Sequence, residues 1–363
     1  MYVKGSRRLL EDPKSILLIQ LGDIGDVVLT LPCIKALGEN FPEAQIVVAV
    51  LEKALDLLED CPGVSEVIGI SKQKRSLLEE LGFQKAFWPR LRRHRFDLAF
   101  DLRTGTRGGI LAFLSGARQR IGFYAHDGKL WRNRIFTHLL NRDYEPTQHV
   151  AQYYLNLLQA YDISTDCIRP ELTISPEKHD QATMLLQRTG VPLRKIIIIQ
   201  PFSLWKYKEW AAEKYAHLID WLQRTYNVAV LVTGSADQKE RAEKIIARCP
   251  QQVFNLAGQT SIGVLPAVLK KGSLFIGVDS AGLHLAAAVG TPTIAIFGPS
   301  SPISWAPLGQ RHMVVTKGLP CQPCRRKGCE DSEVSRCMQE LTVEEVAVAV
   351  ARQMDQLTKS SYQ

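Results

Sequence analysis

The turn Asp279-Ser280-Ala281-Gly282 combines a carboxylate and a hydroxyl with small residues, directly after the apolar run 273–278. Small side chains let the first turn of a following helix approach a ligand, so that its free N–H groups and positive dipole end bind an anion. His284 lies about one turn into that helix. A lone histidine is more often structural, but the neighbouring Asp279 and Ser280 favour a functional role. The turn therefore predicts a phosphate site.

A second turn, Gly22-Asp23-Ile24-Gly25-Asp26, follows the apolar run 16–21. Its glycines allow a tight turn and close approach of a ligand. Asp26 is then either a helix N-cap, for which Asp is a common choice, or a carboxylate that acts on a ligand. The spacing is not G-x-G-x-x-G, and Glu52 is the nearest acidic residue to the end of the second strand, so a nicotinamide cofactor is a weak alternative.

Two more turns offer polar groups. Beyond the run 195–200, Ser203 and Lys208 supply a hydroxyl and a cation that suit a diphosphate, unless this is an ordinary basic loop. Beyond 228–233, Asp237 either faces a ligand or caps the next helix. Because ligands of parallel sheets bind at the carboxyl ends of the strands, we expect all four turns to face one cleft.

Positive charge is concentrated in residues 85–142, which hold thirteen Lys and Arg against three Asp. Such a stretch is either a solvated basic face or a surface for an anionic partner. A phosphorylated substrate, an anionic membrane and a nucleic acid are all compatible with it.

Four cysteines near the C-terminus have a spacing similar to that of metal sites: Cys321, Cys324, Cys329 and Cys337. The gaps between them do not repeat a C-x-x-C knuckle. Structural zinc, an iron–sulfur cluster, disulfides and four free thiols are therefore all open interpretations.

The turns need parallel strands to position them, and the chain shows two series of alternating strands and helices. Expected strands are 16–21, 45–51, 64–70, 96–102, 195–200, 228–233, 253–256, 273–278 and 293–297. Expected helices are 27–37, 53–60, 210–225, 236–249, 280–289 and 342–357. A proline-punctuated segment, 165–192, separates the two series. The pattern predicts an α/β protein with two Rossmann-like, doubly wound domains facing a cleft.

Length and composition agree with two domains. The 363 residues are 45% hydrophobic and 23% charged, as in globular proteins. We place the domains at residues 1–175 and 176–340, followed by a C-terminal helix and tail at 341–363. The first fourteen residues are polar and lack the apolar core of a signal peptide, so we expect a cytoplasmic protein.

At these residues the sequence resembles the heptosyltransferases of glycosyltransferase family 9, which build the inner core of bacterial lipopolysaccharide. The resemblance extends over nearly the whole chain. The matching motifs, in order, are Gly25-Asp26-Val27, Leu31-Pro32, Lys208-Glu209-Trp210, Asp279-Ser280-Ala281-Gly282-Leu283-His284 and Phe297-Gly298-Pro299.

The resemblance implies a GT-B fold and inverting transfer from ADP-heptose without a catalytic metal. It implies that the N-terminal domain binds the acceptor and the C-terminal domain the donor. Asp26 matches the general base and Lys208 the cation that neutralises the leaving diphosphate. The residues that match donor-binding positions are Ser203, Asp237, Asp279, Ser280, Ala281, Gly282 and His284. Phe202 departs from the family pattern, because a glycine is usual there.

An acceptor of Kdo-bearing lipid A would be anionic, which gives the basic stretch a role. Arg103, Arg107 and Arg120 are the expected acceptor contacts, and we expect a peripheral location at the inner face of the inner membrane. Nucleic acid is not expected, because the basic segment lacks the interleaved aromatic platform expected of proteins that bind single strands. The alternatives are another GT-B nucleotide-sugar enzyme, such as an epimerase, and a protein that binds anionic ligands or nucleic acid through residues 85–142.

Overall fold

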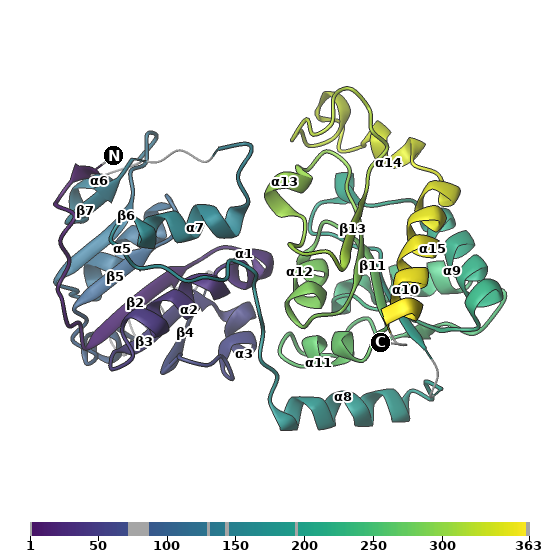
Figure 1. The fold of residues 1–363 in the computed structure, drawn as a ribbon, viewed down its shortest axis with the longest axis horizontal. Helices are drawn as coiled ribbons and strands as arrows, with labels where there is room; N and C mark the ends of the chain where they lie inside the picture. Colours follow the sequence, from purple (N-terminus) through teal and green to yellow (C-terminus); the bar gives the residue numbers. More distant parts are fainter. Residues whose placement is uncertain (1, 72–86, 129–130, 142–144, 193–194, 361–363) are drawn as a thin grey trace, which may run out of the picture. The chain divides into compact units, whose positions relative to one another are not determined.

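A computed structural model describes residues 2–71, 87–128, 131–141, 145–192 and 195–360. The chain forms two compact units, which we call unit 1 (Met1–Thr173) and unit 2 (Ile174–Gln363) (Figure 1). Each is an α/β structure with its own sheet. None of the helices in the described segments is long and apolar enough to span a bilayer.

The described part of unit 1 contains a seven-stranded sheet in the order β1-β7-β6-β5-β2-β3-β4. The strands are β1 (Tyr2–Lys4), β2 (Ser15–Gln20), β3 (Gln45–Leu51), β4 (Glu66–Ile70), β5 (Leu98–Asp101), β6 (Gln119–Phe123) and β7 (His138–Leu140). Strands β2 to β7 pair in parallel, and β1 is an antiparallel edge strand beside β7. From β2 onward this is the Rossmann order, with the direction of winding reversing between β2 and β5.

Both faces of the unit 1 sheet are covered. Alternate residues of a strand point to opposite faces. Leu17 and Ile19 of β2 belong to a core with residues of α5 (Thr106–Leu114) and α6 (Arg132–Ile135). Ile16 and Leu18 face the other way and are also fully buried. Helix α2 (Leu31–Asn40) packs on β3 and against α7 (Val150–Gln159). Other short elements are η1 (Glu52–Ala54) and α3 (Leu55–Leu58).

Unit 2 has a six-stranded parallel sheet among the described residues, in the order β10-β9-β8-β11-β12-β13. The strands are β8 (Ile196–Gln200), β9 (Ala229–Val232), β10 (Phe254–Asn255), β11 (Leu274–Val278), β12 (Thr293–Ile296) and β13 (His312–Val315). Four consecutive isoleucines form most of β8, as expected for a central strand buried on both faces. The order again reverses at the first strand, between β8 and β11.

Helices cover both faces of the second sheet (Figure 1). On one side lie α9 (Ala212–Tyr226), α10 (Lys239–Ile246) and α15 (Val343–Ser360), whose apolar residues share a core with β8, β9 and β11. On the other lie α11 (Leu265–Lys270) and α12 (Ala281–Ala288), with α8 (Pro176–Arg188) against α11. The remaining elements are η2 (Lys206–Lys208), η3 (Ala236–Gln238), α13 (Pro302–Trp305), η4 (Cys329–Asp331) and α14 (Arg336–Glu340).

One helix expectation was wrong. The pattern at 27–37 predicted a single helix, but the structure has two. Helix α1 (Ile24–Val28) ends at Val28, and α2 begins at Leu31 with Pro32 in its first turn. A proline ring inside a helix clashes with the carbonyl four residues earlier, whereas the first turn tolerates it. The break places Asp26 inside a separate one-turn helix.

A buried ion pair lies in unit 1 beside the end of β5. Arg132 is fully buried and its Nη2 lies 3.2 Å from Asp101 Oδ2. The same guanidinium donates to the carbonyls of Phe123 and Arg103. Burial raises the pKa of Asp101 to about 7, although Arg132 and the Arg103 N–H act to lower it. Arg132 belongs to the basic stretch 85–142 but is not part of any basic face.

We predict that Arg132→Ala lowers the free energy of unfolding of unit 1 by about 3–5 kcal/mol at pH 8, because it leaves a buried carboxylate unpaired. An acid whose pKa is raised in the folded state holds its proton more tightly there, so its contribution to stability is present at low pH and lost as the pH rises from about 4 to about 7. The loss should therefore be smaller at pH 5, where Asp101 can take up a proton.

Denaturant unfolding at the two pH values measures this difference. Arg134→Ala, an exposed arginine on the same helix, is the matched control. Equal losses for Arg132→Ala at pH 5 and pH 8 would contradict the assignment.

Candidate active site

The reversal point of the unit 1 sheet brings two predicted residues together. Asp26 lies in the segment after β2 and Arg103 in the turn after β5, and these two strands are neighbours. Ligands of doubly wound sheets bind outside the carboxyl ends of the strands at such a reversal. The polar groups here are therefore at the expected place for a ligand.

Asp26 is held by three donors. Its Oδ1 accepts a hydrogen bond of 2.6 Å from Tyr154 Oη and lies 3.1 Å from Arg103 Nη1. Its Oδ2 accepts from the backbone N–H of Asp23 at 2.9 Å. Asp23, not Asp26, is the N-cap of α1, so the N-cap interpretation of Asp26 was wrong. We call Asp26, Arg103 and Tyr154 the Asp26 cluster.

Tyr154 was missed by the sequence analysis. It lies in α7, more than a hundred residues from Asp26, and only the packing of α7 on α2 brings it near. Burial and the neighbouring Asp26 raise the pKa of Tyr154 well above its ordinary value. The phenol therefore remains protonated and donates to the carboxylate.

Gly22 is required by the close approach of the Asp26 carboxylate. A Cβ at this position would lie 2.5 Å from Asp26 Oδ2 and 2.7 Å from Arg103 Nη1. The Gly22 N–H donates to Gln20 Oε1, and the Gln20 amide donates to Thr30 Oγ1. Thr30 Oγ1 in turn donates to the Asp26 carbonyl, so buried polar groups fix the whole turn.

The other predicted acceptor contacts have different surroundings. Arg107 is exposed in the first turn of α5. Arg120 is half-buried, and its guanidinium donates to the backbone carbonyls of Ile135 and Ala117, both at 2.7 Å. This geometry gives Arg120 a structural task and weighs against a direct ligand contact. Lys85, Lys129 and Arg142 of the basic stretch lie outside the described residues.

The reversal point of the unit 2 sheet carries the second group of predicted residues. Lys208 ends η2 in the loop after β8, and Asp279 follows β11, the neighbouring strand. Lys208 Nζ lies 2.6 Å from Asp279 Oδ2, and His284 Nε2 lies 3.9 Å from Asp279 Oδ1. Asp279 and His284 are buried, whereas the Lys208 side chain is 19% exposed. We call Lys208, Asp279, His284 and Ser203 the Lys208 cluster.

Ser203 joins the two loops of this cluster. Its hydroxyl donates to the Asp279 carbonyl at 3.0 Å, and its backbone N–H donates to Glu209 Oε1 at 3.0 Å. Both donors of Ser203 are thus engaged within the protein. A phosphate contact by this hydroxyl, which stays a prediction, would require the bond to Asp279 to break.

The first turn of α12 approaches the end of β8 closely. Ser280 is the N-cap residue, and Ala281 and Gly282 are the first two helical residues. A Cβ on Gly282 would lie 2.1 Å from Gln200 Oε1. Ala281 and Gly282 begin the helix, so the helix itself cannot satisfy their backbone N–H groups, and they follow closely on Asp279, which pairs with Lys208. Asp237 is exposed in η3, in the turn after β9.

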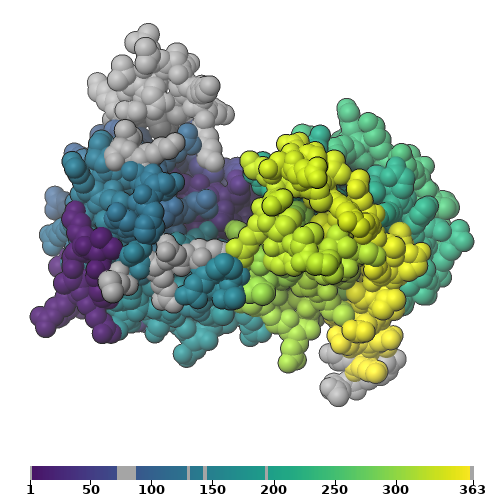
Figure 2. Space-filling view, turned by 90° about the horizontal axis from the view of Figure 1, so that it is seen from above, coloured from purple at the N-terminus to yellow at the C-terminus, as the bar shows by residue number. Residues whose placement is uncertain are grey.

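The four clustered cysteines belong to residues 321–337 of unit 2, a segment within the yellow-green part of the surface in Figure 2. Cys321 and Cys329 are exposed, Cys324 is half-buried and Cys337 is buried, and all are free thiols. Burial raises the pKa of the Cys337 thiol to about 11. Among the described residues no group of three or more His, Cys, Asp or Glu side chains is arranged to hold a metal ion. All four cysteines are free thiols in this arrangement, and a structural zinc or iron–sulfur centre stays one of the open interpretations.

Comparison with known proteins places the chain in a family. The sequence model of glycosyltransferase family 9 (heptosyltransferase) matches residues 84–334. Lipopolysaccharide heptosyltransferase 3 of Escherichia coli is 30% identical over 289 residues, which cover 78% of this chain and 83% of that protein.

Two solved structures have the same fold. A family 9 glycosyl transferase of Veillonella parvula gives a TM-score of 0.83 at 22% identity and covers 97% of this chain and 100% of its own. The E. coli ADP-heptose LPS heptosyltransferase II gives a TM-score of 0.78 at 21% identity, and the match covers 96% of this chain and 100% of that protein. The predicted GT-B fold of two Rossmann-like units is confirmed. The family match covers residues 84–334, which is more than half of this chain. The chain therefore belongs to glycosyltransferase family 9, the heptosyltransferases, and is a glycosyltransferase.

Proposed function

We propose that this chain transfers a heptose from ADP-heptose to the inner core of lipopolysaccharide, on Kdo-bearing lipid A or on the first heptose. The names of its E. coli relatives, which specify lipopolysaccharide and ADP-heptose, support this choice of substrates. The observation that carries the proposal is the pair formed by Lys208 and Asp279 beside the first turn of α12. A cation and free helix N–H groups at a sheet reversal suit a diphosphate.

In the proposed reaction Asp26 is the general base. It accepts the proton of the acceptor hydroxyl as that oxygen attacks the anomeric carbon, from the face opposite the leaving ADP. Oδ1 already has two donors in the described structure, whereas Oδ2 has the Asp23 N–H, so the incoming hydroxyl belongs at Oδ2. Tyr154 and Arg103 hold the carboxylate in place for this contact.

Lys208 neutralises the negative charge that grows on the diphosphate as the glycosidic bond breaks. An ammonium carries three N–H donors, and one of them is directed to Asp279. The remaining donors can bind phosphate oxygens without loss of the Asp279 pair. Asp279 thus orients the lysine, and His284 lies on the other side of the same carboxylate.

The acceptor is expected to be anionic and membrane-bound, which places the protein peripherally at the inner face of the inner membrane. Arg103 in the Asp26 cluster and the exposed Arg107 in the next helix support an anionic acceptor on unit 1. Arg103 would then have two tasks, holding Asp26 and attracting the acceptor.

Asp26→Asn is predicted to lower kcat by about 10²–10⁴-fold, the usual contribution of a general base. The amide has nearly the same shape, so the affinity for ADP should not change. Steady-state kinetics and calorimetric ADP titration measure the two quantities. Loss of ADP binding or of folding together with activity would return Asp26 to a structural role.

Lys208→Ala is predicted to lower kcat by about 10²–10³-fold, because one preorganised electrostatic contact to the leaving group is lost. Lys206→Ala removes an exposed lysine from the same 3₁₀ turn and should leave the kinetics unchanged. Identical kinetics for Lys208→Ala and Lys206→Ala would exclude a phosphate role for Lys208.

The donor nucleotide can be tested by thermal unfolding with ADP, UDP, GDP or NAD. A ligand that binds only the folded state stabilises by an amount that rises with its concentration over Kd. ADP is predicted to raise the unfolding temperature most. Stabilisation by NAD alone would overturn the proposed function.

A further inference from the structure

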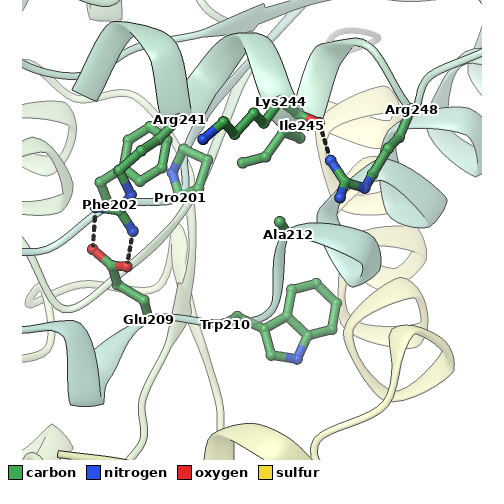
Figure 3. A pocket seen from close by; sticks show the side chains of 9 residues that line it. All are labelled: Pro201, Phe202, Glu209, Trp210, Ala212, Arg241, Lys244, Ile245 and Arg248. Carbon is green, nitrogen blue, oxygen red and sulfur yellow. Dashed lines mark hydrogen bonds and ion pairs between the residues drawn. The ribbon is translucent and has the colours of Figure 1, made fainter.

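The Glu209 carboxylate holds two distant parts of unit 2 together. Its Oε1 accepts from the Ser203 N–H at 3.0 Å and from Arg241 Nη1 at 3.3 Å, and its Oε2 pairs with Arg241 Nη2. The Glu209 side chain is 10% exposed and the Arg241 side chain is 40% exposed, so the carboxylate is shielded from solvent while the arginine remains partly accessible. Figure 3 shows Arg241 coming from α10 and facing Glu209 across the edge of a pocket.

Phe202 supports the arginine from the other side. Its ring is buried, and the Arg241 guanidinium lies 4.6 Å from the ring centroid. A guanidinium over an aromatic face is attracted by the ring quadrupole and retains its planar donors for a carboxylate. Phe202 is also the residue that stands where the resemblance to family 9 leads us to expect a glycine. A glycine at this position would offer the arginine no such support. We call Phe202, Arg241 and Glu209 the clamp.

The clamp closes the loop that carries Lys208. The loop begins at Ser203, whose N–H is bound by Glu209, and it ends at Glu209 itself, the residue after Lys208. One carboxylate therefore ties both ends of the loop, and Arg241 ties that carboxylate to α10. A bidentate arginine–carboxylate pair adds directional specificity to the attraction of opposite charges.

We infer that Arg241 is a positioning residue of the donor site, which acts through Glu209 to hold Lys208 in place for the diphosphate. This inference rests on the proposed role of Lys208. Without Arg241, the Glu209 carboxylate would keep the Ser203 N–H but lose its charged partner. The loop would also lose its connection to α10.

A matched control lies in the same pocket. The pocket has a volume of about 290 Å³ and is lined by Trp210, Lys244 and Arg248 as well as the clamp (Figure 3). Lys244 is one helical turn beyond Arg241 on α10 and is exposed. Lys244→Met therefore makes the same change of charge, on the same helix, without touching Glu209.

The first experiment compares Arg241→Met, Arg241→Lys and Lys244→Met in the full chain by calorimetric ADP titration and by kinetics with ADP-heptose. Methionine can still pack on Phe202 but cannot pair with Glu209. Arg241→Met should raise Kd for ADP and KM for ADP-heptose roughly tenfold, in the usual range for coupled neighbours. Arg241→Lys should recover part of the loss, and Lys244→Met should match the wild type.

A double-mutant cycle separates positioning from a general loss of stability. If Arg241 acts through Lys208, Arg241→Met should have little further effect on ADP affinity in a Lys208→Ala background. Independent, multiplicative losses would overturn the inference. Should Arg241→Met unfold, Glu209→Gln gives the second test, because the amide can still accept from Ser203 but loses the ion pair, and it should also weaken ADP binding.

The outcomes distinguish this inference from the proposed function. A folded Arg241→Met or Glu209→Gln variant with unchanged Kd for ADP, beside a wild type that binds ADP, overturns the role of Arg241 alone. A wild type that binds no nucleoside diphosphate overturns the proposed function and this inference with it.

Discussion

The parallel pairing of β2 with β5, and of β8 with β11, is the constraint on which both clusters depend. In each sheet the second strand of the pair comes much later in the chain than the first, and the connections leave on opposite sides. The segments that follow the two strands therefore lead to different helices, but they begin next to each other at the same edge of the sheet. This geometry brings Asp26 near Arg103 in unit 1, and Lys208 near Asp279 in unit 2.

Charge compensation at these two points follows one pattern. In each unit a mostly buried carboxylate is paired with a longer basic side chain that retains some exposure, Asp26 with Arg103 and Asp279 with Lys208. Burying an isolated carboxylate would be costly, so the basic partner stabilises the fold and also orients the acid. The remaining donors of the basic group are then available to a ligand.

Further polar contacts sustain this arrangement away from the ligand. Asp101 and Arg132 fix the turn that carries Arg103, and the clamp fixes the loop that carries Lys208. Neither device contains a residue that the proposed chemistry uses. Both place a guanidinium over an aromatic ring, Phe136 for Arg132 and Phe202 for Arg241. A planar cation can use its face for the ring and its edge for a carboxylate at the same time.

The sequence by itself predicted the strands that lead into the turns carrying Asp26, Lys208 and Asp279, and it predicted those turns, because apolar periodicity and small-residue turns are local properties. It did not predict the strands β1, β6, β7 and β13 or the helices α5, α7, α8 and α11. Its motifs also led to the family. Only the tertiary structure decided the partners: Tyr154 for Asp26, and Arg241 for Glu209. These contacts join residues that are far apart in the chain, so no local pattern records them. For the same reason the burial of Arg132, within a stretch that looks uniformly basic, became visible only in the fold.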